Sequence, residues 1–280
     1  METLKPTAME MRKMMVLAIS IVSCVLCMNG QTPLEITKMG VEKYNAGETE
    51  KGIELLKQAF EQYEPNAWFY LGYLAINGKV EGMSPESGRF WVEKSAEQGV
   101  GLAQMLMGNL CLSDNKLDDE KFMKGYAWYR KAKAQGVQEA VASVAQMDSI
   151  INSFSEIEKD IYLRNLCYQK EYELAFEWFE KESNAGNDSF LYDLGFMYYK
   201  GIGTKEDCAK AEEWMVKAAT KGSCRAQWFL YNVYNMSGGT CFKKDADKAV
   251  MWMKKAVAQG YNQAYFMQEY QNSWMSKVDR

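Results

Sequence analysis

The feature that most constrains the fold of this chain is a tryptophan that recurs five times in the same local setting. In each copy a lysine follows the tryptophan after three residues and a glycine follows it after eight. The five tryptophans are Trp91, Trp128, Trp178, Trp214 and Trp252. Three of the four steps between them measure 36 to 38 residues, and the step from Trp128 to Trp178 measures 50. A period of this length indicates stacked structural units, because one such unit alone cannot bury its apolar face.

A single period, residues 188–222, predicts two helices. Asp188 is expected to cap a first helix, which places Leu191, Leu194 and Tyr198 on one face at helical spacing. The second helix carries Ala211, Trp214, Ala218 and Ala219 at the same kind of spacing. Both helices therefore have an apolar side on which a neighbour can pack.

Glycines mark the ends of these two helices. Gly201 and Gly203 are expected to break the first helix, and Thr204 with Asp207 has the spacing of a capping box for the second. Gly222 is expected to supply the left-handed turn that ends the second helix. The sequence therefore predicts that one unit consists of two antiparallel helices.

This unit resembles the Sel1-like repeats of the tetratricopeptide superfamily. The residues that carry the resemblance are Leu194, Gly195, Tyr198, Gly201, Gly203, Asp207, Lys210, Ala211, Trp214, Ala218 and Ala219. The last unit keeps most of the pattern but has Tyr231 where the family has glycine, and the resemblance covers roughly residues 35–270. It implies an all-α fold: an α-solenoid with a right-handed superhelix, built from about six helix pairs and closed by a C-terminal capping helix over 262–275.

The long step of 50 residues predicts additional material between two blocks of repeats. Residues 137–153 are apolar enough to form an extra helix, so we expect an N-terminal block over 35–153 and a C-terminal block over 154–280. We expect the joint to be rigid, because an apolar face that includes Val144 and Ile151 would otherwise be exposed.

The N-terminus is predicted to be an export signal, residues 1–30. An apolar run at 14–28 has the length of a signal h-region and is too short to span a bilayer comfortably. Cys24 ends a segment that resembles a bacterial lipobox and would then carry a lipid. Ordinary cleavage near Gly30 is an alternative, and an uncleaved anchor is a third. We expect a bacterial protein that is periplasmic, outer-membrane-anchored or secreted, without a membrane span after processing.

The cysteines beyond this leader form an odd set without regular spacing: Cys111, Cys167, Cys208, Cys224 and Cys241. Such a set does not predict a disulfide framework. Cys208 and Cys241 each precede a second helix, so one bridge between them is conceivable. Small buried thiols are the preferred interpretation.

Several classes of chemistry are disfavoured by the sequence. The chain has no histidine, which removes histidine triads and histidine zinc sites, and its net charge of −4 gives no basic surface for nucleic acid. Residues 113–116, SDNK, fit motifs of penicillin-recognising enzymes. Those enzymes take the motifs from separate segments, so a polar turn is the preferred interpretation. We expect no catalytic residues, no cofactor and no metal.

The family resemblance also implies where a partner would bind, because the first helix of each stacked pair lines the concave side. The positions that correspond to this groove are Phe69, Tyr73, Ile76, Met105, Asn109, Tyr192, Phe196, Tyr199, Trp228, Asn232 and Asn235. Aromatic rings for contact and asparagine amides for a peptide backbone suit a polypeptide. Each of these side chains could instead pack between helices.

The sequence as a whole predicts a non-catalytic scaffold of the cell envelope that binds a protein or peptide of unknown identity. Two alternatives come from other functional classes. One is a cell-wall or penicillin-related enzyme or ligand binder, which rests on fold analogy alone. The other is a purely structural subunit of an envelope assembly.

Overall fold

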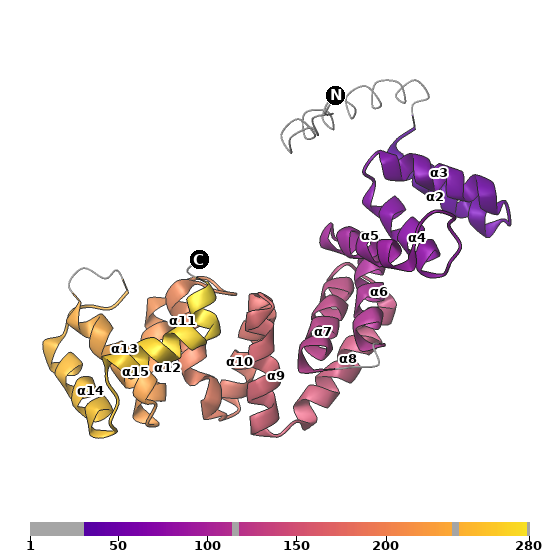
Figure 1. Ribbon diagram of the computed structural model, residues 1–280. Helices are drawn as coiled ribbons and strands as arrows, with labels where there is room; N and C mark the ends of the chain where they lie inside the picture. Colours follow the sequence, from indigo (N-terminus) through magenta and orange to yellow (C-terminus); the bar gives the residue numbers. More distant parts are fainter. Residues whose placement is uncertain (1–30, 114–117, 237–240, 279–280) are drawn as a thin grey trace, which may run out of the picture. The chain divides into compact units, whose positions relative to one another are not determined.

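The protein is all-α in the part that the structure describes, residues 31–113, 118–236 and 241–278, where no β-strand is present. The computed structural model contains fourteen α-helices, α2 to α15, and two short 3₁₀ helices in these residues (Figure 1). The predicted fold class is therefore confirmed. The predicted signal segment, with Cys24, lies outside the described residues.

The helices follow one another with short connections. In the N-terminal half they are α2 (Pro33–Asn45), α3 (Thr49–Glu61), α4 (Pro65–Ile76), α5 (Pro85–Glu97), α6 (Gly101–Leu112), α7 (Asp119–Ala134) and α8 (Gln138–Ser153). In the C-terminal half they are α9 (Glu156–Tyr168), α10 (Tyr172–Asn184), η2 (Asp188–Phe190), α11 (Leu191–Lys200), α12 (Cys208–Thr220), α13 (Cys224–Asn235), α14 (Ala246–Ala258), α15 (Gln263–Asn272) and η3 (Trp274–Lys277).

Most of these helices pack as consecutive pairs. The pairs are α2 with α3, α4 with α5, α6 with α7, α9 with α10, α11 with α12, and α13 with α14. Six pairs agree with the number expected from the sequence. Among the described helices, α8 and α15 stand outside this pairing, and α8 occupies the region where an extra helix was expected.

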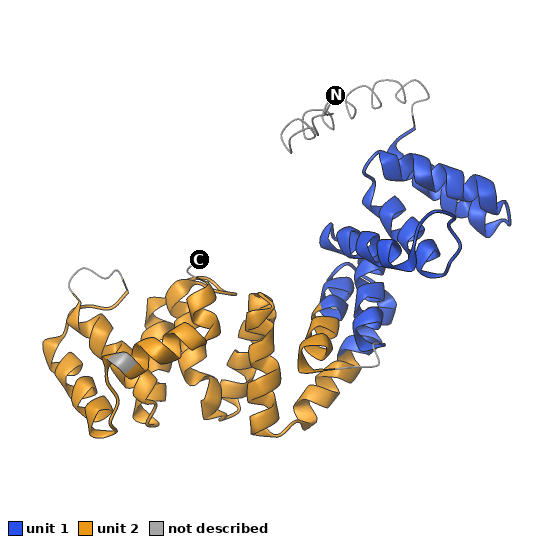
Figure 2. Cartoon of the chain, viewed as in Figure 1, with its two compact units in different colours: residues 1–113, 128–144 blue, residues 114–127, 145–280 orange. Residues whose placement is uncertain are grey.

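The chain forms two compact units (Figure 2). The first unit comprises residues 1–113 and 128–144, and the second comprises 114–127 and 145–280. This division runs through α7 and α8, whereas the sequence analysis placed a boundary between residues 153 and 154. The two boundaries differ because the repeat period marks where the sequence pattern is interrupted, whereas each compact unit is a set of residues that contact one another.

The recurring tryptophan and lysine are explained by a contact between them. In four of the five copies the lysine ammonium lies over the tryptophan ring of the preceding turn, as cation–π pairs do. The distances from Nζ to the ring centre are 4.8 Å for Lys131, 4.0 Å for Lys181, 4.5 Å for Lys217 and 4.4 Å for Lys255. In the remaining copy, Lys94 instead lies over Phe90 and pairs with Glu97.

The recurring glycine ends the second helix of its unit in a left-handed turn, as predicted. All five copies have a positive φ: Gly99 (87°), Gly136 (82°), Gly186 (98°), Gly222 (100°) and Gly260 (78°). A residue with a Cβ is strained in this conformation, so the backbone favours glycine at these five positions.

Two predicted helix caps were wrong. Asp207 itself caps α12, with its Oδ1 accepting from the Lys210 amide at 3.0 Å, so Thr204 does not serve as the cap. The reason is the extended backbone of Asp207 directly before the helix. Asp188 lies inside η2, which Asn187 caps, and α11 begins after it.

Close approach between first and second helices depends on small residues. A Cβ added to Gly72 on α4 would lie 2.6 Å from the carbonyl oxygen of Gly88 on α5, and 2.9 Å from Val92. The two backbones therefore touch at this crossing, and α4 is held against α5 along one side. Phe69, three residues before Gly72, packs in one core cluster with Val92 of α5, and Tyr73 lies one helical turn after Phe69.

The C-terminal segment differs from the expected cap. It does form a helix, α15, but α15 contacts α13 and the following η3 contacts α9. The tail therefore packs on first helices of its own unit, in addition to following the last pair. Its tryptophan and methionine are buried there, which gives the segment its anchor.

Candidate protein-binding surface

Two of the predicted groove residues, Phe69 and Tyr73, line an apolar pocket of about 300 Å³ in the first unit. We call it the N-terminal pocket, and its lining residues are Val41, Tyr44, Asn45, Leu56, Phe69, Tyr70, Tyr73, Leu74 and Leu102. Apart from Leu56 on α3, all of them come from α2, α4 and α6, which are first helices of successive pairs. The pocket therefore lies where the repeat pattern places a binding surface.

The N-terminal pocket has a buried floor and an exposed rim. Phe69 is 8% exposed, whereas Tyr73 is 46% and Leu102 is 47% exposed. The rings of Phe69 and Tyr73 stack with their centres 6.3 Å apart. None of the nine lining residues carries a charge, so the pocket suits an apolar or aromatic side chain, with Asn45 and the tyrosine hydroxyls as polar contacts.

Other predicted residues of the first unit do not line this pocket. Met105 is half-buried on α6, and Ile76 is half-buried against the core that includes Val92. Asn109 is exposed, but its Oδ1 accepts a hydrogen bond from the Tyr129 hydroxyl at 2.8 Å. That oxygen holds α6 to α7 and is engaged within the fold.

In the second unit, three predicted groove residues lie in the interior. Tyr192, Phe196 and Trp228 are 6%, 3% and 8% exposed. Trp228 donates its indole N–H to Gln263 of α15 at 2.8 Å, and Phe196 meets Trp274 edge to face. As folded, these side chains contact the chain itself. Whether they also contact a partner stays a prediction.

The remaining predicted residues of the second unit lie around this interior. Tyr199 is half-buried and its ring centre is 5.8 Å from that of Phe242. Asn232 is half-buried and Asn235, the last residue of α13, is exposed. The two asparagines are therefore the predicted polar contacts that remain at least partly accessible in this unit.

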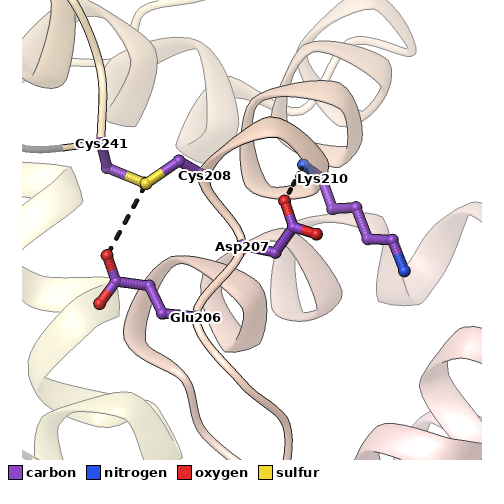
Figure 3. Close-up of a disulfide and its surroundings, with 5 residues drawn as sticks. All are labelled: Glu206, Asp207, Cys208, Lys210 and Cys241. Carbon is purple, nitrogen blue, oxygen red and sulfur yellow. Dashed lines mark hydrogen bonds between the residues drawn. A yellow bond between two sulfur atoms is a disulfide. The ribbon is translucent and has the colours of Figure 1, made fainter.

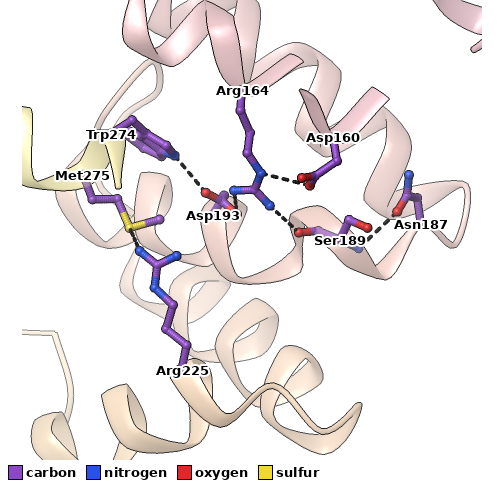
Figure 4. A network of polar contacts seen from close by, with 8 residues as sticks. All are labelled: Asp160, Arg164, Asn187, Ser189, Asp193, Arg225, Trp274 and Met275. Atoms are coloured by element: carbon purple, nitrogen blue, oxygen red, sulfur yellow. Dashed lines mark hydrogen bonds and ion pairs between the residues drawn. The ribbon is translucent and has the colours of Figure 1, made fainter. Parts of the chain in front are cut away.

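The tail is held on the second unit by a network around a buried aspartate (Figure 4). The Trp274 indole N–H donates to Asp193 Oδ1 at 2.8 Å, and Arg164 Nη1 donates to Asp193 Oδ2 at 2.6 Å. Arg164 also donates to Asp160 at 2.9 Å and to the Ser189 carbonyl oxygen at 2.9 Å. Burial alone would lower the pKa of Arg164, but the two carboxylates outweigh it and raise the pKa above its usual value. The guanidinium stays charged, and it compensates the buried Asp193.

Sequence reasoning missed Arg164, Asp193 and Trp274. They lie on three elements far apart in the chain, and no local motif joins them. A tryptophan and a methionine near the end of the tail were the available signal, because such residues usually need a partner surface. The repeat pattern gave no reason to look for that surface among the first helices.

Cys208 and Cys241 form a disulfide (Figure 3). It joins the start of α12 to the segment before α14, so it links two neighbouring repeats. The preferred interpretation of these two cysteines as separate buried thiols was therefore wrong. Cys208 follows the cap residue Asp207 and Cys241 precedes the corresponding Asp245 by four residues, so the two positions differ within the repeat and only the packing of one repeat on the next brings the sulfurs together. The carboxylate of Glu206 lies 3.7 Å from the Cys208 sulfur, but with both sulfurs joined neither is a thiolate that could bind a metal.

The thiol of Cys167 is poorly suited to nucleophilic chemistry. Burial raises its pKa well above the usual value, and the charge of Asp193 adds to this. A thiol that stays protonated at neutral pH is a weak nucleophile.

None of the described helices combines the length and the apolar character needed to cross a membrane.

The chain is similar to several known proteins. The chain is 23% identical over 208 residues to the ERAD-associated E3 ubiquitin-protein ligase component HRD3A of Arabidopsis thaliana, covering 71% of this chain and 30% of that protein. It is 24% identical to a Sel1 repeat protein from Oxalobacter formigenes, with a TM-score of 0.39 and coverage of 81% and 88% of the two chains. It is 26% identical to a protective antigen present in uropathogenic Escherichia coli strains that displays an SLR fold, with a TM-score of 0.38 and coverage of 88% and 49%.

The family assignment rests on the repeats themselves. A family model of the Sel1 repeat matches residues 65–100, 102–137, 164–187, 189–223 and 234–261. These segments take in more than half of the chain. They contain α4, α5, α7, α10, α11, α12 and α14 in full, together with the tryptophan–lysine contacts described above, whereas most of α9 and α13 lies between them. The chain therefore belongs to the Sel1 repeat family.

Proposed function

We propose that this protein is a non-catalytic scaffold of the cell envelope that binds a segment of a protein partner on the first helices of its repeats. The observation that carries the proposal is the N-terminal pocket, where Phe69, Tyr73 and Leu102 surround an uncharged hollow. Sel1 repeats generally mediate protein–protein interactions. An exposed aromatic rim over a buried aromatic floor is the kind of site that anchors one side chain of a partner.

The location in the envelope rests on two independent features. The apolar run at 14–28 has the character of an export signal, and the Cys208–Cys241 disulfide fits an oxidising compartment better than a reducing one. In this proposal the segment around Cys24 either carries a lipid anchor or is removed by ordinary cleavage. Mass spectrometry of the mature N-terminus distinguishes the two outcomes.

The binding proposal is tested by photo-crosslinking in intact cells of the source organism. A photoreactive amino acid replaces Tyr73 in the full-length protein, and adducts are identified by mass spectrometry. We expect one recurrent polypeptide, because the pocket is a single site of defined chemistry.

Phe90 provides a matched control position. It is 49% exposed, close to the 46% of Tyr73, but it lies on α5, a second helix. The photoreactive residue at position 90 should not give the adduct obtained at position 73. Equal adducts at both positions, or adducts only at position 90, would assign the contact to another face and contradict the proposal.

A further inference from the structure

The tail site of the second unit is the surface on which Trp274 and Met275 are buried. Trp274 is 2% and Met275 is 0% exposed. The ring centre of Trp274 lies 6.0 Å from that of Phe196 on α11 and 6.2 Å from that of Tyr172 on α10. This surface comprises residues of the second unit alone, and a short segment of polypeptide already occupies it.

The position of Trp274 is well matched to this surface. Its indole N–H reaches a carboxylate that is itself held by a charged guanidinium, Arg164. All three nitrogens of Arg164 donate, to Asp160, Asp193 and the Ser189 carbonyl oxygen. Charge-assisted hydrogen bonds of this kind are stronger than neutral ones, so the site discriminates in favour of an aromatic residue with a donor.

The side chain of Met275 is poorly matched to the guanidinium of Arg225 that it contacts. Arg225 Nη2 donates to the Met275 sulfur at 3.2 Å, and the guanidinium carbon lies 4.4 Å from the ring centre of Tyr192. Arg225 Nε is buried without a hydrogen-bond partner. A thioether is a weak acceptor, whereas a guanidinium binds a carboxylate through two parallel hydrogen bonds.

Nothing else in the described part of the second unit supplies that carboxylate. No acidic group of residues 118–236 and 241–278 lies within ion-pair distance of Arg225. Glu269 lines the same cavity, but its oxygen accepts from the Tyr261 hydroxyl at 2.5 Å. The cavity measures about 710 Å³ and is bordered by Arg164, Arg225 and Trp274 among others, so a ligand group has room to approach the guanidinium.

We propose that the tail site recognises a polypeptide segment in which a tryptophan is followed directly by an acidic residue. The tryptophan takes the place of Trp274 on Asp193, and the acidic side chain takes the place of Met275 and pairs with Arg225. The tail holds the site until such a segment displaces it. This inference rests on the proposed function, because it names the chemistry of one segment that the scaffold binds.

The test compares peptides on the full-length protein. One labelled peptide has the sequence of residues 273–280, SWMSKVDR, and a second has glutamate in place of Met275. Binding is followed by fluorescence anisotropy. We expect the glutamate peptide to bind at least about tenfold more tightly, which corresponds to one charge-assisted hydrogen bond. A third peptide with alanine in place of Trp274 should not bind.

A matched protein variant isolates the role of Arg225. In Arg225→Gln the preference for glutamate over methionine should disappear, because the carboxylate has lost its cationic partner. Equal affinity for the two peptides in the original protein would overturn the proposal. The proposal would also be overturned if Arg225→Gln still bound the glutamate peptide more tightly than the methionine peptide.

A substitution in the tail itself tests the proposal without an added peptide, which would have to displace the tail before it could bind. In full-length Met275→Glu, we expect hydrogen exchange in α15 to become slower, although a glutamate at a fully buried position normally destabilises a protein. Faster exchange would contradict the proposal. Dimers formed by exchange of tails between two copies would assign the site to a second copy of this chain and would also overturn it.

Failure of the tail-site proposal can be distinguished from failure of the proposed function. The crosslinks at Tyr73 report on the first unit, which contains no residue of the tail site. Crosslinks at position 73 without peptide preference in the second unit would remove this inference alone. Absence of those crosslinks would count against the proposed function whatever the peptides do.

Discussion

At Gly72 the absence of a side chain lets two helices touch. The carbonyl oxygen of Gly88 lies 2.6 Å from the position that a Cβ would take. A similar approach recurs at Gly195, where the nearest atoms are the Cγ of Met215 at 2.9 Å and its backbone nitrogen at 3.1 Å. Both glycines follow a leucine at the same place in the Sel1 pattern. The repeat pattern places a glycine at both positions, but the kind of atom on the other side could only be learned from the structure.

Replacing Gly72 by alanine should lower the free energy of unfolding by about 1–3 kcal/mol, because a backbone oxygen at 2.6 Å cannot move aside without shifting a helix. Gly195→Ala is the matched change. It should cost less, since Met215 has a flexible side chain and alanine favours a helix. Urea unfolding followed by helicity measures both. A larger loss for Gly195→Ala than for Gly72→Ala would contradict this difference between the two helix crossings.

At the scale of elements, the repeat pattern predicts the order of most helices. It does not predict the path of the segments outside the repeats. Helices α11 to α14 follow the Sel1 pattern closely, so their order could be predicted. The path of α15 and η3 could not be predicted, because it depends on the hydrogen bond from Trp274 to Asp193 and on the ion pair of Asp193 with Arg164. The disulfide was left open for a similar reason: Cys208 and Cys241 belong to two neighbouring repeats and come together only after these repeats stack.

The disulfide should stabilise the last two repeats. Cys208 and Cys241 are 33 residues apart, and closing a loop of this size typically contributes about 2–4 kcal/mol. We expect the double replacement by serine to lower the free energy of unfolding by about that amount, mainly in α12 to α14. Urea unfolding with and without a reductant tests this. If the reductant leaves the midpoint of the native protein unchanged, the bridge has no such role.

At the scale of the whole molecule, two units are joined by helices that belong to both. The connection after α8 is packed within the second unit, where the ring centre of Phe154 lies 6.0 Å from that of Phe122 and 4.6 Å from that of Tyr162. Ser155 and Glu158 form a capping box at the start of α9. An aromatic cluster and a cap at one connection oppose local opening.

Limited proteolysis should therefore spare residues 149–159. We expect cutting to begin near the ends of the chain, because cleavage requires local unfolding and the connection is held by side-chain packing. Phe154→Ala should make the connection a site of early cleavage. Rapid cutting of the original protein there, with release of two stable halves, would instead identify a hinge.

Alkaline conditions should weaken the second unit. Burial raises the pKa of Tyr192, Tyr234 and Tyr261 above the ordinary value of 10.0, and hydrogen bonds to Glu212 and Glu269 add to this for the last two. A raised pKa means that the folded state favours the protonated phenol. The stability that these groups contribute is therefore complete below about pH 10 and is lost as the pH rises through the folded-state values.

Thermal unfolding between about pH 7 and about pH 12 measures this effect. The midpoint should fall above about pH 10, and Tyr261→Phe should reduce the fall, because the variant has no phenol to ionise beside Glu269. An identical alkaline fall in Tyr261→Phe would show that other groups control it.

The central claim is that first helices of the repeats form the binding surface, and hydrogen exchange with the crosslinked partner tests it most directly. Full-length protein is compared with and without that partner, and backbone amides are followed helix by helix. We predict slower exchange in α2, α4 and α6, whose side chains line the N-terminal pocket, and unchanged exchange in α5. Protection confined to the second helices α3 and α5 would contradict the account.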